Sequence, residues 1–194
     1  MKKYTGFTLI ELMVVVAIVA LMAVLAAPSF KQMIQSNAIS SAVNSFMADM
    51  RFARSEAIRR GGSVVLCRSN SPEAADPNCG TGSGTAGRGW KTGWFVFHDL
   101  DGDQSKDASE PVLRAQGSLT SLDYALETSG GASSTKFRFT PTGRLVSLGA
   151  STGIQFGGAA FPTEQQRVVC ISVGGRARVA LDADGKATGN ASCN

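Results

Sequence analysis

The chain has 194 residues, of which 43% are hydrophobic, and a formal net charge of +4 at pH 7. This length accommodates one globular domain together with a membrane anchor. Because the net charge is small, the overall field is too weak to hold nucleic acid, so any such binding requires a local cluster of cations. The single histidine, His98, excludes a metal site built from several histidines, and no G-x-S-x-G or phosphate-cradling motif occurs. We therefore expect a non-enzymatic protein without a cofactor.

An apolar segment runs from Phe7 to Ala27, and Glu11 lies near its start. About 21 residues at a rise of 1.5 Å give a helix of about 31 Å, which is enough to cross a bilayer and too long for a secretory signal. Lys2 and Lys3 place the amino terminus on the cytoplasmic side. A carboxylate within hydrocarbon costs roughly 2 kcal/mol or more, so a plain anchor leaves Glu11 unexplained.

Residues 29–60 are predicted to continue as an amphipathic helix, after a kink or local opening at Pro28. The helix should end at Gly61 and Gly62. Apolar residues recur every three or four positions, at Ile39, Val43, Phe46, Met50, Ala53 and Ala57. Four arginines lie in the last turns, where cations suit the helix dipole, and we interpret them as helix-end capping: Arg51, Arg54, Arg59 and Arg60.

After Gly62 the pattern changes to short strands, which predicts an α+β protein with a β-rich head over residues 61–194. A polar, glycine-rich loop is expected over residues 69–89. Strands are predicted at 63–67, 93–99, 111–116, 121–127, 136–146 and 153–158. Residues 167–173 and 176–181 are predicted to form a hairpin around a Gly174-Gly175 turn. His98 lies within the second predicted strand, where we expect a structural role.

The four cysteines have spacings that fit neither a zinc site nor a redox pair. An even number of cysteines behind a membrane-targeting segment is typical of disulfides in an oxidising compartment. Three pairings are possible. We favour Cys67–Cys79 and Cys170–Cys193, because each closes a local loop and the second would hold the C-terminal tail.

An aspartate-rich segment follows the second predicted strand. Its oxygen-bearing side chains occupy positions 1, 3, 5, 7, 9 and 12 of a calcium loop: Asp99, Asp101, Asp103, Ser105, Asp107 and Glu110. Position 6 is Gln104 rather than glycine, so the sharp turn of such a loop lacks its usual residue. We therefore favour a solvated hairpin loop, with calcium binding as the alternative.

Arg176 and Arg178 are expected to share one face of the last predicted strand, about 6.6–6.8 Å apart along it. Ala177 and Val179 would then face the core. Two forked guanidiniums at this spacing can grip phosphate oxygens without reading sequence. The alternative is an exposed hairpin with two solvated arginines.

The hexad Gly6-Phe7-Thr8-Leu9-Ile10-Glu11 resembles the processing site of type IV prepilins and pseudopilins, and Pro28 also matches a family position. The resemblance implies that a prepilin peptidase removes residues 1–6 and that Phe7 becomes the methylated amino terminus. It further implies that residues 7–28 form the transmembrane and filament-core helix. There Glu11 would neutralise the amine of a neighbouring subunit, so that burial of the two charges is offset only on assembly.

The rest of the chain resembles the FimT/GspH-type minor pilins, through MRFARSEAIRRGGSVVLC, GWFVFHDLDGD, FRFTPTGR and RVVCIS. The resemblance implies a long bent helix packed on a small antiparallel β-sandwich-like head, the type IV pilin fold. Gly175, Arg176, Ala177 and Arg178 match the Gly-Arg-x-Arg DNA-binding element of FimT-type pilins. Lys186 and Arg167 could extend this patch, whereas Asp182 and Asp184 would weaken it.

The function implied by this resemblance is that of a minor pilin that binds DNA, without sequence specificity and with modest affinity, during natural transformation. The implied partners are other pilins, the prepilin peptidase, the inner membrane and DNA. The protein would be a single-pass inner-membrane protein with a periplasmic head, incorporated into an extracellular pilus. The alternatives are a structural or priming subunit of the pilus tip and a pseudopilin of type II secretion.

Overall fold

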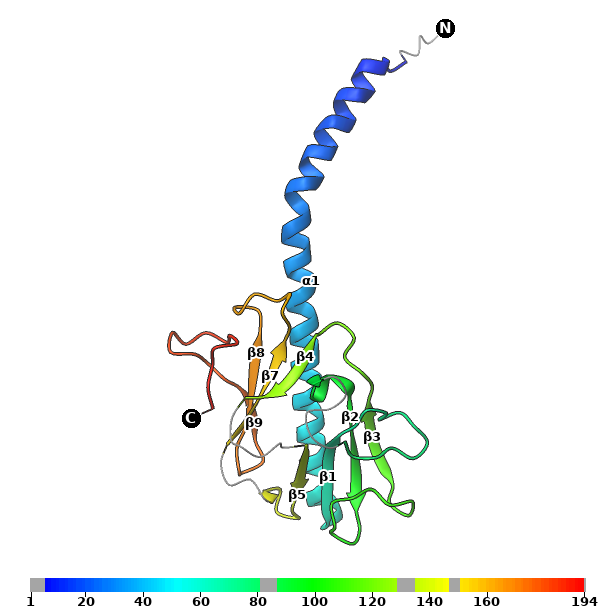
Figure 1. Cartoon of the computed structure of the whole chain (residues 1–194), viewed down its shortest axis with the longest axis vertical. Coiled ribbons are helices and arrows are strands. Elements are labelled where there is room, and N and C mark those ends of the chain that lie inside the picture. The colour runs from blue at the N-terminus through cyan, green and yellow to red at the C-terminus, as the bar shows by residue number, and fades with distance from the viewer. Residues whose placement is uncertain (1–5, 81–86, 129–134, 147–150, 194) are drawn as a thin grey trace. The chain divides into compact units, whose positions relative to one another are not determined.

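The computed structural model describes residues 6–80, 87–128, 135–146 and 151–193 (Figure 1). Helix α1 extends from Leu9 to Arg60 without interruption, so the backbone remains helical at residue 28. The chain divides between Asn37 and Ala38 into two compact units, so α1 contributes to both. The second unit holds the β-rich head that the sequence predicts.

Both ends of α1 are capped. The hydroxyl oxygen of Thr8 accepts the N–H of Glu11 at 3.3 Å, which satisfies one of the donors left free at a helix start. At the other end Gly61 has a φ of +62°, and the N–H groups of Gly61 and Gly62 donate to the carbonyls of Ile58 and Ala57. This pair of bonds forms a Schellman motif, and it explains why the helix ends where the two glycines predict.

The last turns of α1 also contain a buried acid, Glu56. Its carboxylate accepts hydrogen bonds from Arg59 at 2.6 Å and from Arg60 at 2.8 Å. These two guanidiniums lower the pKa of Glu56 from 4.5 to about 2. The carboxylate of Glu56 therefore stays ionised, and two arginines of the same helix balance its charge.

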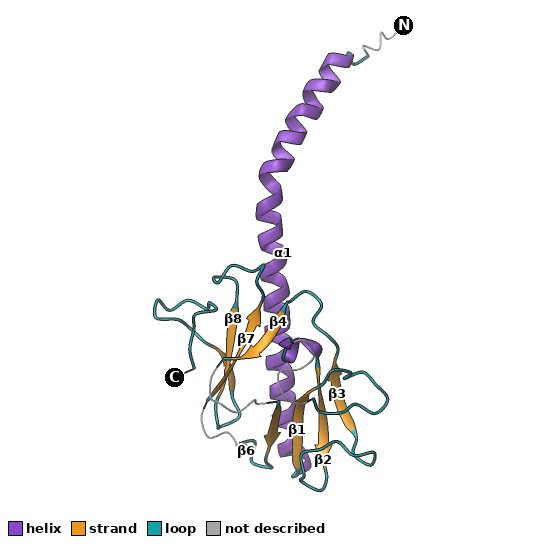
Figure 2. Ribbon diagram, viewed as in Figure 1, coloured by secondary structure: helices purple, strands orange, loops and turns teal. Residues whose placement is uncertain are grey.

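The described residues of the head form two antiparallel sheets (Figure 2). The first has the order β3-β2-β1-β5-β6, and its strands are β1 (Ser63–Arg68), β2 (Trp94–Asp99), β3 (Val112–Gln116), β5 (Lys136–Phe139) and β6 (Leu145–Val146). The second has the order β4-β7-β8-β9, and its strands are β4 (Tyr124–Glu127), β7 (Thr152–Gly157), β8 (Arg167–Ile171) and β9 (Ala177–Val179). The antiparallel α+β architecture expected from the sequence is confirmed.

The sequence prediction differs from the structure in two elements before the last hairpin. The single strand expected over residues 136–146 is two strands, because Thr140–Gly143 form a turn in which the Gly143 N–H donates to the Thr140 carbonyl. Directly after the predicted loop, η2 (Trp90–Thr92) is a short 3₁₀ helix that buries Trp90. The alternation of apolar residues cannot reveal either feature, since both are too short to show a period.

The main core joins α1 to both sheets through Phe46, whose side chain is fully buried. Its ring lies 5.4 Å from that of Trp94 in the first sheet and 5.7 Å from that of Phe156 in the second, measured between centroids. It also meets Trp90 edge-on at 5.3 Å. The apolar helical positions predicted from the sequence are all buried in this core.

A buried polar contact fixes α1 against the first sheet. Asp49 accepts a hydrogen bond from the indole N–H of Trp94 at 2.8 Å and one from Arg114 at 2.7 Å. The Arg114 guanidinium also lies 4.5 Å from the ring centre of Phe52. A buried carboxylate is costly unless it is paired, and here both partners come from the sheet.

Each sheet has a small apolar cluster on the side away from the main core, and a disulfide is part of each cluster. Cys67–Cys79 lies with Val65, Phe95 and Phe97. Cys170–Cys193 lies with Val168, Ala180 and Ala191. The structure thus contains both disulfides favoured from the sequence, and the second one ties the C-terminal tail to β8.

Truncation of Phe46 tests whether this ring joins the two sheets to the helix. We expect Phe46→Ala to lower the free energy of unfolding by about 3–5 kcal/mol, because a fully buried aromatic ring leaves a cavity. Urea unfolding of the detergent-solubilised chain, followed by tryptophan fluorescence, measures this change. Leu100→Ala, at a side chain that is 58% exposed, is the control and should cost less than about 0.5 kcal/mol. Equal losses in the two variants would contradict the proposed role of Phe46.

The lowered pKa of Glu56 predicts a pH-dependent contribution to stability. Since the folded-state pKa lies below the ordinary value, the contribution is complete above about pH 4.5 and is lost as the pH falls toward 2. Glu56→Gln should destabilise the protein at pH 7 and flatten the decline in its melting temperature over this interval. Glu164→Gln removes an exposed carboxylate and serves as the control. A decline that persists unchanged in Glu56→Gln would show that other groups cause it.

Candidate functional site

The candidate site centres on the turn between β8 and β9. The N–H of Gly175 donates to the Ser172 carbonyl at 2.8 Å, and the N–H of Ser172 donates to the Arg176 carbonyl at 3.0 Å. Gly175 has a φ of +74°. This is a three-residue loop, Val173 to Gly175, whose last residue is left-handed, instead of the two-residue Gly174-Gly175 turn expected from the sequence. Arg176 therefore precedes β9, at the base of the turn.

Two glycines allow this turn to approach the rest of the head closely. A β-carbon on Gly175 would lie 2.5 Å from the carbonyl oxygen of Gly143, and one on Gly143 would lie 2.9 Å from both Arg54 Nε and Ile58 Cδ1. The N–H of Leu145 also donates to the Val173 carbonyl at 3.1 Å. The end of α1, the β5–β6 turn and the β8–β9 turn are therefore in mutual contact.

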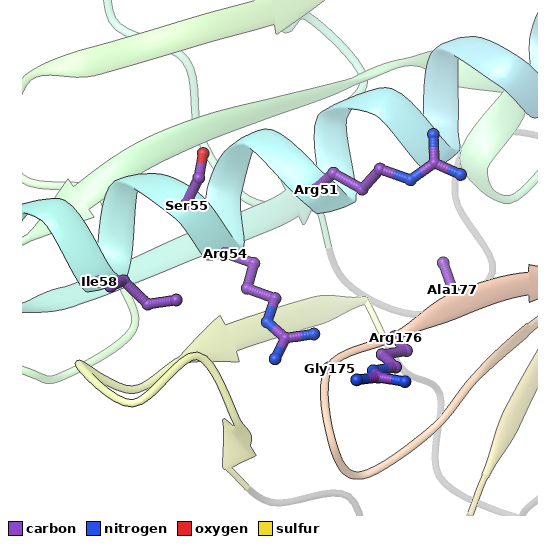
Figure 3. A pocket seen from close by; sticks show the side chains of 7 residues that line it. All are labelled: Arg51, Arg54, Ser55, Ile58, Gly175, Arg176 and Ala177. Carbon is purple, nitrogen blue, oxygen red and sulfur yellow. The ribbon is translucent and has the colours of Figure 1, made fainter.

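A groove of about 440 Å³ lies between the end of α1 and the β8–β9 turn (Figure 3). We call it the arginine groove, and its lining residues are Arg51, Arg54, Ser55, Ile58, Gly175, Arg176 and Ala177. Arg51 and Arg176 are exposed, and Arg54 is half-buried. Figure 3 shows the Arg54 side chain directed from the helix toward the turn that carries Arg176.

The cations of the arginine groove have no acidic partner in the part of the chain that the structure describes. Of the three guanidiniums there, of Arg51, Arg54 and Arg176, none forms an ion pair or hydrogen bond with a described residue. The two nearest acids along the helix are engaged elsewhere, Asp49 by Trp94 and Arg114 and Glu56 by Arg59 and Arg60. The four helix arginines, all expected to cap the helix, are thus divided between an internal pair and the groove.

Arg178 lies in different surroundings from Arg176. It is exposed on β9 opposite Cys170, and it lines a separate hollow of about 480 Å³ with Asp182 and residues of the C-terminal tail. Ala177 and Val179 pack against the main core, as the sequence predicts. Arg176 and Arg178 thus flank Ala177 but line different hollows.

The other residues considered for the basic patch are partly engaged. The guanidinium of Arg167 donates to the carbonyls of Glu164 and Gln166 at 2.7 and 2.8 Å. Lys186 is exposed, and its backbone N–H donates to the Asp182 carboxylate at 2.9 Å. That carboxylate also accepts from the Thr188 hydroxyl and the Asp184 N–H, and these bonds lower the pKa of Asp182.

The aspartate-rich segment forms a loop held by its own side chains. Carboxylate oxygens of Asp99, Asp101 and Asp103 lie within 4.8 Å of one another. Asp99 is buried, accepts from the Ser63 hydroxyl at 2.9 Å and lies 3.6 Å from Arg138.

The two remaining acids of the calcium pattern have other surroundings in this loop. The carboxylate of Glu110 accepts the N–H groups of Leu100 at 2.6 Å and of Asp107 at 3.1 Å. Neither Asp107 nor Glu110 belongs to the carboxylate cluster among the described residues. These contacts fit a closed hairpin loop, and proximity alone does not indicate a cation.

His98 is half-buried beside the junction of α1 and β1, where a β-carbon on Gly62 would lie 2.8 Å from its Nε2. No cluster of acids or cysteines includes it among the described residues. Its position fits the structural role expected from the sequence.

The first unit presents apolar side chains to its surroundings. Phe7 is 85% exposed, and large exposed apolar residues continue along the helix as far as Ile34. α1 contains a segment long and apolar enough to cross a membrane. Glu11 is exposed in the first turn of this helix, where an acid also suits the helix dipole.

Comparisons with known proteins match both parts of the chain. The GspH family, described as type II transport protein GspH, matches residues 42–190, and the prokaryotic N-terminal methylation motif matches residues 1–27. Comparison with curated proteins found no match.

Two crystal structures of the Pseudomonas aeruginosa type IV minor pilin FimU resemble this chain at 21% identity. The first has a TM-score of 0.51 and aligns 78% of this chain with 92% of that chain. The second has a TM-score of 0.50 and aligns 76% with 95%. At this identity the likeness shows a shared fold.

Proposed function

This chain belongs to the GspH family of type II transport proteins, and we propose that it is a minor type IV pilin that binds DNA during natural transformation. The observation that carries the DNA-binding proposal is the exposure of Arg176 and Arg178 on either side of Ala177, at the free edge of the second sheet. Guanidinium groups bind phosphate oxygens in a bidentate manner, and such contacts carry no sequence information. We therefore expect binding that is modest and independent of sequence.

The membrane-anchoring part of the proposal rests on the N-terminal methylation motif and the apolar helix. In this proposal a prepilin peptidase cleaves after Gly6, and Phe7 becomes the methylated terminus. Residues 7–28 then anchor the chain in the inner membrane as a single span, with the head in the periplasm until the subunit enters the pilus. The exposed apolar side chains of this helix would pack against those of other pilins.

For Glu11 the proposal competes with a local explanation. Thr8 and Glu11 have the spacing of a capping box, and the Thr8 hydroxyl already accepts the Glu11 N–H. A glutamine serves a capping box as well as a glutamate does, but it cannot neutralise the amine of a neighbouring subunit. Substitution by glutamine therefore separates the two roles.

A second candidate function is that of a pseudopilin of type II secretion, or of a structural subunit at the pilus tip. The description of the matching family as a type II transport protein favours it. The arginines of the head would then contact other subunits instead of DNA. Secretion defects on deletion, with normal DNA binding capacity of the cells, would identify the pseudopilin. Co-purification of other minor pilins, with no DNA mobility shift at low salt, would identify the structural subunit.

The first test of the proposal measures DNA binding by the full-length chain in nonionic detergent. We expect Arg176→Gln/Arg178→Gln to weaken binding of a fluorescently labelled duplex by about tenfold or more at low salt. For the wild type, log K should fall with log salt with a slope of about −2 to −3, as for two or three phosphate contacts. The control, Arg88→Gln/Lys91→Gln, removes the same charge beside η2. Equal affinity of the wild type and the Arg176/Arg178 variant would reject the assignment.

The second test concerns Glu11. We expect Glu11→Gln to remain in the membrane at normal abundance but to be depleted from sheared pili, because the amine at Phe7 is left without its counter-charge. Thr8→Val, which removes the capping hydroxyl and keeps the acid, should still enter pili. Immunoblotting of the membrane and pilus fractions measures both. Normal incorporation of Glu11→Gln would leave helix capping as the explanation of this residue.

A further inference from the structure

We propose that the arginine groove is the main phosphate-binding site of the head, with Arg51 and Arg54 of α1 binding DNA alongside Arg176. This inference rests on the proposed DNA-binding function, and it assigns phosphate binding to a different set of residues. The sequence pairs Arg176 with Arg178 along one strand, whereas the structure groups Arg176 with two helix arginines. Arg178 then makes a secondary contribution.

The charge distribution supports this grouping. Of the described residues that line the groove, three are arginines and none is acidic, while the hollow beside Arg178 contains Asp182. The carboxylate of Asp182 is held in its charged form by the hydrogen bonds that lower its pKa. An incoming phosphate is therefore attracted to the arginine groove and partly repelled from the surroundings of Arg178.

The groove is also preorganised in the protein without ligand. Arg51, Arg54 and Ile58 are spaced at three- and four-residue intervals and so lie on one face of α1. The Gly143 turn lies against the stem of Arg54, and the Gly175 turn lies against Gly143. A side chain already confined by its neighbours loses less conformational entropy on binding than a free one.

The shape and chemistry of the groove suit a phosphodiester backbone. Ile58, which is 52% exposed, and Ala177 supply apolar lining, and the cations flank it. The Ser55 hydroxyl donates to the Phe52 carbonyl at 2.8 Å. The lining side chains thus offer guanidinium donors that suit phosphate, and we expect contacts that position the backbone without reading bases.

The test compares single and double variants of the full-length chain in nonionic detergent, by fluorescence anisotropy with a labelled random-sequence DNA duplex. We expect Arg51→Gln/Arg54→Gln to weaken binding at least as much as Arg176→Gln, and to reduce the salt slope by about 1 for each phosphate that is no longer neutralised. Arg178→Gln should weaken binding less than Arg176→Gln does. Arg88→Gln/Lys91→Gln controls for the removal of two positive charges.

Two further variants separate binding from folding. Arg51 is exposed, so Arg51→Gln alone removes a guanidinium without disturbing the packing beside Gly143. Arg54→Lys keeps the charge and most of the stem, and it should retain more affinity than Arg54→Gln. Melting temperatures within a few degrees of the wild type are required for each variant that enters the comparison.

The outcomes distinguish the inference from the function on which it rests. If the wild type binds DNA and Arg51→Gln/Arg54→Gln binds equally well, the groove assignment is overturned and the proposed function stands. A larger decrease in affinity for Arg178→Gln than for Arg176→Gln also overturns it, in favour of the strand pair. If the wild type binds no DNA at low salt, the proposed function fails, and the groove assignment fails with it.

Discussion

The structure of the head depends on the packing of one face of α1 against both sheets in a single core. Phe46 is the centre of this contact, because its ring meets aromatic side chains from both sheets and from η2. Burial of large aromatic rings supplies much of the apolar area in a small head, and edge-to-face geometry adds to it. The burial of this face thereby fixes the orientation of α1 about its own axis, relative to the sheets. Once that rotation is set, Arg51, Arg54 and Ile58 lie beside the two turns, and the arginine groove follows from the packing of the core.

The electrostatics of α1 explain why its arginines are not equivalent. Asp49 and Glu56 are both buried acids, and each has its own partners: Asp49 is bound by Trp94 and Arg114, and Glu56 by the last turn of the helix. Buried carboxylates must be paired, so these acids are unavailable to other cations. Among the described residues of the second unit, Arg51 and Arg54 therefore present positive charge without an acidic partner beside the β8–β9 turn. A modest net charge for the whole chain is compatible with a local anion site of this kind.

The disulfides lie in the apolar clusters on the sheet faces that are outside the main core. Each sheet buries its inner face against α1, and each outer face has its own small apolar cluster that includes a cystine. The Cys170–Cys193 bond holds the C-terminal tail next to β8. A cross-link stabilises mainly by restricting the unfolded chain, which is useful for a small head.

The sequence by itself determined the apolar helix, its end at Gly61-Gly62 and the approximate strands, because periodicity and the effect of glycine are local properties. It favoured the local cysteine pairs without excluding the other two pairings. It could also have indicated that Arg51, Arg54 and Ile58 share a helix face. Only the tertiary structure decided which arginines lie together. Their spacing in the sequence suggested that Arg176 and Arg178 act as a pair, but in the structure Arg176 lines the arginine groove and Arg178 lines the hollow beside Asp182. The contact of Gly175 with Gly143, residues far apart in the chain, then places Arg176 beside the helix, and no local pattern encodes a contact of that range.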